Sequence, residues 1–226
     1  MLSNLLSGDL GVLDAVIYII SALAVIFLTM PIHEFAHAFI GVKLGDNTPR
    51  WQGRYTLNPF AHIDYFGALC IILFGFGWAK PVQINHNNLE NPKRDMAFIA
   101  LAGPVSNILV ALIALIFLNA VLLISGIAAL GVLSYLASFF FFVAEINVYL
   151  AVFNLIPVPP LDGSRILTSF LPYKTYYTIM RYERYIYFGL IAVLYLGWLD
   201  LPLNFLSSYV LGFLNNLASL PFRLFL

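Results

Sequence analysis

Long apolar runs constrain this chain more than any other feature of its sequence. A helix needs about 20 apolar residues to cross the hydrocarbon core of a bilayer. Five runs approach or exceed that length, and they cover Val12 to Val42, Met96 to Ser125, Leu130 to Ile156, Tyr185 to Leu199 and Leu203 to Leu220. The composition agrees, since 62% of the 226 residues are hydrophobic and 10% are charged. We therefore predict an all-α polytopic membrane protein with about five transmembrane helices.

A sixth apolar run, Tyr65 to Trp78, is too short to cross a bilayer and contains three glycines. It predicts a re-entrant or interface-embedded segment. If that segment dips into the membrane and returns, all eleven lysines and arginines fall on one side. Because short cytoplasmic loops collect lysine and arginine, we predict a multi-pass protein of the cell membrane, with its N-terminus outside and its C-terminus in the cytoplasm.

Charge and cysteine content exclude several functions. Eleven basic and eleven acidic residues give a formal net charge of zero, so no basic face is predicted to bind nucleic-acid phosphates. A single cysteine, Cys70, allows neither a disulfide framework nor a thiolate zinc cluster within the chain. Any metal site must therefore use histidine and carboxylate ligands.

Ionisable side chains stand near the end of the first apolar run, where their burial in a membrane is costly. His33 and His37 are four residues apart, which on a helix places both imidazoles on one face within reach of a single metal ion. Glu34 lies about 100° around the same helix, close enough to touch a metal-bound water without being a ligand. This is the His-Glu-x-x-His arrangement of zinc peptidases. It predicts a zinc site near the cytoplasmic leaflet, against the alternative of a structural histidine pair.

Two histidines do not complete a catalytic zinc site, which usually takes three protein ligands. His62 and His86 lie in polar connections and could supply the third. Asp162 is better placed, because three prolines end a membrane helix just before it on the predicted cytoplasmic side. The alternative is that Asp162 only caps a short helix that begins near Gly163.

Five segments of the chain resemble the site-2 proteases, a family of intramembrane zinc metalloproteases. They are HEFAH at 33–37, LNPFAHID at 57–64, GWAKPV at 77–82, AGPVSN at 102–107 and FNLIPVPPLDG at 153–163, in the order that the family has them. The resemblance implies one zinc ion per chain, held by His33, His37 and Asp162, with Glu34 as the general base. It also implies that Asn154 polarises the scissile carbonyl or holds the substrate backbone, and that Asn107 contacts the substrate or supports the structure.

Polar residues within the apolar runs also have structural alternatives. Asn107 and Asn154 could simply cross-link helices through hydrogen bonds. Glu145 is the one other carboxylate well within a predicted span. We interpret Glu145 as a structural polar contact between helices.

The polar stretches TPRWQGRYTLNPFAHID at 48–64 and AKPVQINHNN at 79–88 alternate aromatic and polar residues, which indicates short strands. In the site-2 proteases this region forms a small sheet beside the active site, and its edge could take up an extended substrate by strand addition. We therefore predict a small membrane-associated β-sheet.

No connection is long enough for the peptide-binding or nucleotide-sensing domain that many site-2 proteases carry. We predict a single domain over residues 1–226, with a catalytic core at about 12–172 and C-terminal helices at about 173–226. Substrate selection then depends on the membrane core, the terminal helices or a separate adaptor.

The resemblance implies an endopeptidase that cleaves within or next to a transmembrane segment of a membrane-protein substrate in the lipid bilayer. Such cleavage serves regulated intramembrane proteolysis or clearance of signal-peptide remnants. A catalytically silent relative that binds membrane proteins is one alternative, although the presence of Glu34 and of all three ligands disfavours it. A metal transporter is another, but that class has several spans with intramembrane ligands and a pseudo-symmetric repeat.

Overall fold

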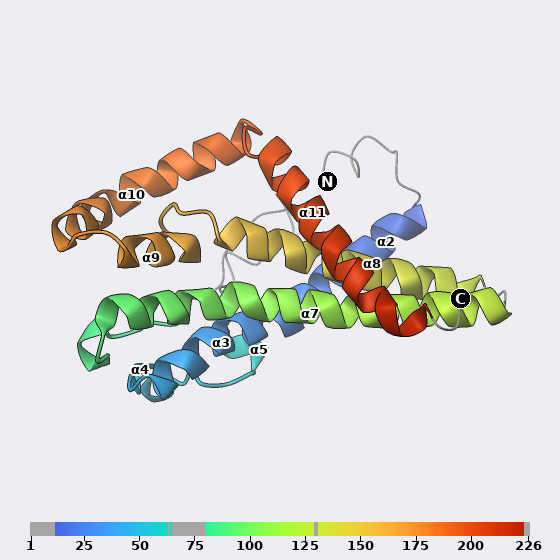
Figure 1. Ribbon diagram of the computed structural model, residues 1–226, viewed down its shortest axis with the longest axis horizontal. Coiled ribbons are helices and arrows are strands. Elements are labelled where there is room, and N and C mark those ends of the chain that lie inside the picture. Colours follow the sequence, from blue (N-terminus) through green and yellow to red (C-terminus); the bar gives the residue numbers. More distant parts are fainter. Residues whose placement is uncertain (1–11, 63, 65–79, 129–130, 224–226) are drawn as a thin grey trace.

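The computed structural model describes residues 12–62, 64, 80–128 and 131–223, and Figure 1 shows their arrangement. The first long helix is formed by α2 (Val12–Ala24), η1 (Val25–Thr29) and α3 (Met30–Lys43), which follow one another without a break. Two further long helices are α7 (Pro92–Ala128) and α8 (Val132–Asn154). The shorter elements are α4 (Thr48–Trp51), α5 (Pro59–His62), η2 (His86–Asn88) and α9 (Asp162–Ser169). The C-terminal part contains α10 (Tyr173–Tyr195), α11 (Asp200–Ser219) and η3 (Leu220–Phe222).

Three of these helices are long and apolar enough to cross a membrane: Val12–Lys43, Pro92–Ile124 and Val132–Asn154. The protein is therefore an all-α membrane protein, as predicted. The prediction of about five spans is wrong for the part of the chain described above. The remaining two runs form α10 and α11, which pass the same test only as a pair that is bent by 82°.

The bend between α10 and α11 has a local cause. Gly197 has a φ of 71°, a left-handed conformation that glycine adopts at little cost. Asp200 begins α11, and that helix contains three asparagines. The polar residues and the break leave neither helix with the uninterrupted apolar length of about 20 residues that a span needs.

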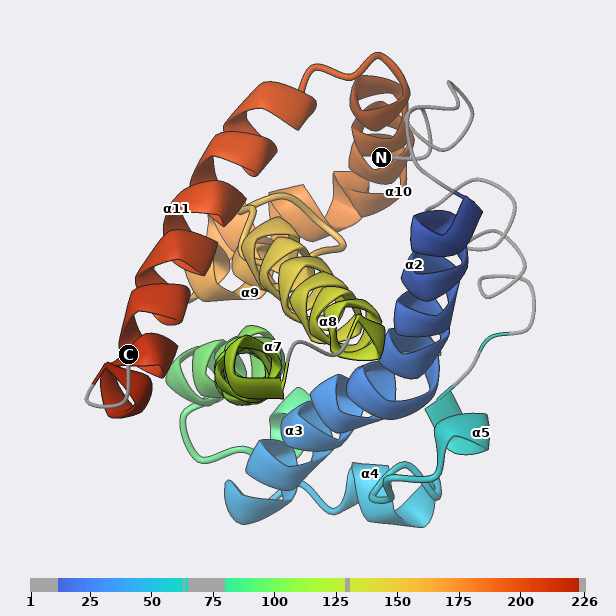
Figure 2. The same cartoon turned by 90° about the vertical axis from the view of Figure 1, so that its right-hand side faces the viewer.

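The long helices pack into a bundle, which Figure 2 shows nearly end-on. In it, α7 contacts α3, α8 and α11, and α8 also contacts α2. The buried cluster that α7 and α8 share contains Ala111, Ala114, Ala137 and Ala144, of which Ala111 and Ala144 are 0% exposed. In a membrane, small side chains let helix backbones approach closely and gain van der Waals contact. The first helix packs along this pair, with α3 against α7 and α2 against α8.

The prediction of a small β-sheet is wrong, because the described parts of 48–64 and 80–88 contain helices and irregular segments and no strand. Thr48–Trp51 and Pro59–His62 are single helical turns instead. The segment after Lys80 meets the α5 region through a 2.8 Å hydrogen bond from the Lys80 N–H to the carbonyl of His62, without a strand ladder around it.

Local side-chain hydrogen bonds explain why turns replace the predicted strands. Asp46 Oδ1 accepts from the Thr48 N–H at 3.0 Å, and Asn58 Oδ1 accepts from the Phe60 N–H at 3.1 Å. Such contacts compete with strand pairing and favour turns and helix starts. A proline lies in the first turn of each of these helices, and the fixed φ of proline suits that position.

Asp46 links the end of the first helix to the segment that precedes α7. Its side chain is 0% exposed and also accepts from the Asn85 N–H at 2.8 Å and from Asn88 Nδ2 at 2.7 Å. Burial alone would raise the pKa of Asp46, but the hydrogen bonds from Thr48, Asn88 and Asn85 outweigh it and hold the pKa below its ordinary value. This link attaches the segment that contains Asn85 and Asn88 to the end of α3.

The predicted re-entrant segment, Tyr65 to Trp78 with Cys70, lies outside the described residues. The single domain over residues 1–226 stays a prediction.

Candidate metal centre

The two motif histidines lie one above the other on α3. Their ring centroids are 4.7 Å apart, the rings are nearly perpendicular at 83°, and the two Nε2 atoms are 3.0 Å apart. His37 Nδ1 lies 2.6 Å from the carbonyl oxygen of Ile99 on α7. A neutral His37 ring that donates from Nδ1 to this carbonyl directs the lone pair of Nε2 towards His33.

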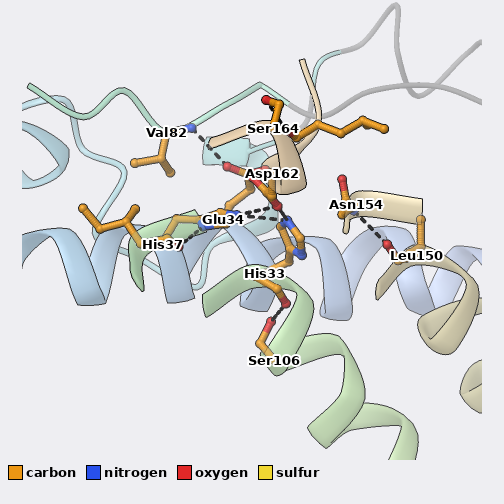
Figure 3. Close-up of polar contacts among 12 residues, drawn as sticks. His33, Glu34, His37, Val82, Ser106, Leu150, Asn154, Asp162 and Ser164 are labelled. Carbon is orange, nitrogen blue, oxygen red and sulfur yellow. Dashed lines mark hydrogen bonds and ion pairs between the residues drawn. The ribbon is translucent and has the colours of Figure 1, made fainter. Parts of the chain in front are cut away.

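Asp162 reaches the two histidines from α9, far away in the sequence. Its Oδ2 atom lies 3.4 Å from His33 Nε2 and 3.3 Å from His37 Nε2. One ligand atom from each of the three residues lies within 4.8 Å of the other two. Figure 3 shows the three side chains pointing toward one another.

Packing of α9 against its neighbours places Asp162. At Gly163, a Cβ atom would lie 2.6 Å from the carbonyl oxygen of Ile156 and closer still to that of Leu155. A glycine therefore lets the start of α9 pack directly on the end of α8. At the far end of α9, the Lys93 ammonium on α7 donates to the carbonyl of Leu171. These contacts fix α9 at both ends.

The structure gives no support to the alternative that Asp162 only caps α9. The N-cap position is Leu161, and no side-chain hydrogen bond caps the helix. The buried Oδ2 atom of Asp162 also has no hydrogen-bond partner among the described residues. The carboxylate is therefore directed at the histidines rather than at the backbone of its own helix.

These three residues fit a zinc ion. Two imidazole nitrogens and a carboxylate oxygen crowd into one place, and facing lone pairs repel unless a proton or a cation lies between them. Burial alone would raise the pKa of Asp162, but the charge that His37 carries when protonated and contacts with both histidines outweigh it and hold the pKa well below its ordinary value. Two histidines and one carboxylate form a known ligand set of catalytic zinc.

Gly103 brings the backbone of α7 against the histidine rings. A Cβ atom at this position would lie 2.6 Å from His33 Nε2 and closer still to His37 Nε2. Ser106 Oγ donates to the carbonyl of Gly103 at 2.7 Å and reinforces this turn of α7. The glycine therefore closes one side of the candidate site with backbone.

Glu34 also lies on α3 and is 9% exposed. Its Oε2 atom accepts a 3.0 Å hydrogen bond from the N–H of Val82, which Figure 3 shows above the site. A backbone donor of this kind stabilises a carboxylate and fixes its orientation. Sequence reasoning gave no role to Val82 or Gly103, although both lie in the segments GWAKPV and AGPVSN that carried the resemblance.

The M50 pattern and two groups of relatives place the chain among known proteins. The pattern of peptidase family M50 matches residues 123–196, which include Asn154 and Asp162 but not the HEFAH motif. The chain is 40% identical over 148 residues to YwhC of Bacillus subtilis (strain 168), whose name describes a proposed zinc metalloprotease, and the match covers 65% of the chain and 67% of YwhC. The chain belongs to peptidase family M50. This confirms the resemblance to the site-2 proteases.

More distant relatives are the Rip2 proteins, whose name also describes a proposed zinc metalloprotease. The Rip2 protein of Mycolicibacterium smegmatis is 29% identical over 147 residues, covering 60% of the chain and 51% of that protein. Rip2 of Mycobacterium tuberculosis (strain ATCC 25618 / H37Rv) is 29% identical over 153 residues, covering 66% and 56% respectively. The chain thus spans little more than half the length of these relatives. No solved structure matches the chain.

The two asparagines predicted to contact the substrate of this M50 protein lie on α8 and α7. Asn154 ends α8 and donates to the carbonyl of Leu150 at 3.0 Å, as Figure 3 shows. Asn107 is 1% exposed on α7, one turn beyond Gly103, and its Oδ1 atom has no hydrogen-bond partner in the described part of the chain.

His62 and His86 do not join the group of ligand atoms that contains Asp162. His62 is 1% exposed, and its Nε2 atom lies 2.7 Å from the carbonyl of Thr56. His86 begins η2, where burial and the charge of Arg165 lower its pKa. Of the three candidates for the third ligand, Asp162 is the one that the structure places beside the two motif histidines.

Proposed function

We propose that this M50 protein is a zinc-dependent intramembrane endopeptidase, which hydrolyses peptide bonds within or next to a transmembrane segment of a membrane-protein substrate. The convergence of His33, His37 and Asp162 beside Glu34 carries the proposal. The motif lies in the last part of the candidate span Val12–Lys43, so the site belongs to the membrane-embedded bundle. The zinc metalloprotease names of its relatives support the same reaction.

The metal ligands would be Nε2 of His33, Nε2 of His37 and Oδ2 of Asp162. When bound, zinc supplies a Lewis acid that polarises a carbonyl group and makes water more acidic. The Ile99 carbonyl accepts from His37 Nδ1 and so keeps the ring in the tautomer that presents Nε2 to the ion. The backbone of Gly103 on α7 lies directly against the Nε2 atoms of both rings and limits their movement.

Glu34 acts as the general base. Its carboxylate takes a proton from the water whose oxygen attacks the scissile carbonyl carbon, and later gives that proton to the amine nitrogen as the C–N bond breaks. The Val82 N–H holds Oε2 and thereby limits rotation of the carboxylate. Both proton transfers therefore use one carboxylate, whose orientation is set by the hydrogen bond from Val82.

Asn154 and Asn107 contact the substrate. The Asn154 amide has two N–H groups, of which one is used by the carbonyl of Leu150. The second N–H donates to the carbonyl oxygen of the scissile bond, where a neutral donor stabilises developing negative charge without adding a buried charge. Asn107 Oδ1, which has no hydrogen-bond partner among the described residues, accepts from a substrate N–H.

The metal centre faces the cytoplasmic leaflet of the cell membrane. Lys43 ends the first candidate span, and Arg50 and Arg54 follow it. Short loops with such cations lie on the cytoplasmic side. The N-terminus of the first span is then outside. If α10 and α11 do not cross, three spans leave the C-terminus in the cytoplasm.

Labelling of single cysteines tests this topology. In a Cys70→Ser background, we expect Gly131→Cys to react with a membrane-impermeant maleimide from outside and Ser169→Cys to react only from the cytoplasmic side. The opposite pattern would refute the orientation. A third cysteine at Phe222 tells whether the bent pair crosses, because external labelling there would place the C-terminus outside.

The decisive test of the function replaces Glu34 by Gln in purified protein. The wild-type protein should contain about one zinc ion per chain by elemental analysis and cleave a helical transmembrane peptide in detergent. Glu34→Gln should keep the zinc and lose cleavage, because an amide cannot accept the proton. Glu145→Gln is the matched control, since it changes a carboxylate elsewhere in the bundle, and it should cleave normally.

Three outcomes would contradict the proposal in different ways. Cleavage by Glu34→Gln would remove the assigned base. A wild-type protein that binds zinc and a membrane peptide without cleaving it would be a silent relative. Full zinc content in Asp162→Ala would mean that the third ligand is another residue.

A further inference from the structure

The first membrane helix is interrupted by a π-helical turn directly before the histidine motif. Val25–Thr29 form this turn, η1, between α2 and α3. Hydrogen bonds from residue i to i+5 take up one residue more than an α-helical turn, and such turns are frequent at functional sites. One residue corresponds to about 100° of rotation in an α-helix. The turn therefore changes the direction in which every α3 side chain points relative to α2.

Burial shows that the extra residue shifts the inward face of the helix. Ile17 and Ser21 face the bundle and are 7% and 0% exposed. In an uninterrupted α-helix the residue seven positions after Ser21 lies on the same face, and that residue is Leu28. However, Leu28 is 65% exposed, whereas Thr29 is 2% exposed. Thr29 has taken the inward position that Leu28 would otherwise occupy.

Polar contacts with α8 lie on both sides of the π turn. Ser21 Oγ, before the turn, lies 3.4 Å from the carbonyl oxygen of Phe139. Thr29, at the end of the turn, accepts a long 3.5 Å contact from Nδ2 of Asn147. Asn147 is 0% exposed and also donates to the carbonyl of Val143 at 2.8 Å. Burial of an amide in an apolar bundle costs free energy unless hydrogen bonds satisfy it, so a buried asparagine that is retained indicates a specific contact between helices.

The two halves of the first helix, α2 and α3, must direct particular side chains toward different neighbouring helices. α2 must present Ser21 to α8, while α3 must present His33 and His37 to Asp162 on α9 and to Gly103 on α7. With one residue fewer in the turn, one of these two faces would rotate away from its partner. We propose that the π turn and Asn147 are positioning elements, which set the rotation of α3 that aims the two histidines at Asp162.

This inference rests on the metal site of the proposed function, and deletion of Leu28 tests it. The deletion removes one exposed residue from the π turn and should lower zinc affinity by at least about 100-fold, the upper end of the loss seen when an indirect support of a metal ligand is removed. Zinc affinity is measured by competition with a chelator in detergent. Deletion of Leu13, which is 48% exposed in the first turn of α2, is the matched control and should leave the affinity unchanged.

A second pair of variants keeps the test valid if the shortened helix does not fold. Asn147→Ala should lower zinc affinity about tenfold, as loss of an indirect support of a metal ligand does. Asn119→Ala is its control, because Asn119 donates to Asn215 Oδ1 of α11 at 3.2 Å and to the carbonyl of Leu115 at 2.8 Å. Both substitutions should lower the thermal midpoint, but only Asn147→Ala should weaken zinc binding.

The outcomes separate this inference from the proposed function. Wild-type zinc affinity in a folded Leu28 deletion, or equal zinc affinities in Asn147→Ala and Asn119→Ala, would overturn the positioning role and leave the metal site intact. A wild-type protein that binds no zinc would overturn the metal site itself. Circular dichroism and gel filtration in detergent establish which variants are folded.

Discussion

Substitution of Gly103 by alanine probes the metal centre most directly, because it adds one methyl group at the histidine rings. The added Cβ of the alanine would lie 2.6 Å from His33 Nε2, whereas ordinary van der Waals contact begins at 3.4 Å. Ordinary contact with His33 Nε2 would require α7 and the His33 ring to separate by 0.8 Å, the difference between these two distances. Since metal ligands tolerate about 0.2 Å, the three ligand atoms can no longer share one ion in their present arrangement.

The expected size of the effect follows from overpacking. An added methyl group in a packed interior costs about 1–3 kcal/mol, which corresponds to a loss of about 5- to 150-fold in zinc affinity if the strain falls on the site. Chelator competition measures the affinity, and elemental analysis measures the zinc that remains after purification. We expect Gly103→Ala to bind zinc weakly and to cleave substrate in proportion to its zinc content.

Two other helical glycines provide controls. A Cβ atom added at Gly189 in α10 or at Gly212 in α11 would meet no neighbouring side chain or packed segment within 4 Å. Alanine at either position should leave zinc affinity unchanged and raise helix stability by up to about 1 kcal/mol. Wild-type zinc affinity in Gly103→Ala would refute the reasoning, because it would show that α7 does not hold the histidine rings.

Three further predictions concern other parts of the chain. Gly163→Ala should release zinc and lower the thermal midpoint, because its Cβ would meet the carbonyls that end α8; normal zinc content would contradict the packing described for α9. The depressed pKa of Asp46 means that its ionised form stabilises the fold above about pH 4, and that this contribution disappears as the pH falls through the folded-state pKa. Thermal unfolding should therefore lose stability less steeply in acid for Asp46→Asn than for the wild type. Asn154→Ala should lower kcat about 100- to 1,000-fold while zinc content stays normal, and a change in KM alone would point to a binding role.

The chemistry of the candidate site was the most predictable part of the molecule. The spacing of His33 and His37 predicts a shared face on any helix, and the proline-broken segment before Asp162 indicates a carboxylate near the same membrane surface. The structure places the three side chains together, although their roles stay predictions. The support from Val82 and Gly103 could not be derived, because it depends on how distant segments pack.

Two fold predictions failed for identifiable physical reasons. The alternation of aromatic and polar residues at 48–64 suggested strands, but Asp46 and Asn58 bond to nearby backbone N–H groups and start helical turns instead. The last two apolar runs suggested separate spans, but Gly197 and Asp200 divide them with a sharp bend. The π turn at Val25–Thr29 has no compositional signal, since its residues would suit an ordinary membrane helix equally well.

The placement of the three ligands on α3 and α9 has a consequence for biosynthesis. The ribosome makes His33 and His37 before α7 and α8 exist, and Asp162 emerges only after both of those helices. A nascent chain therefore carries an incomplete ligand pair throughout the insertion of the bundle. On the proposed function, the metal centre is complete only when α9 has docked, so a chain that stops before Asp162 lacks the third ligand.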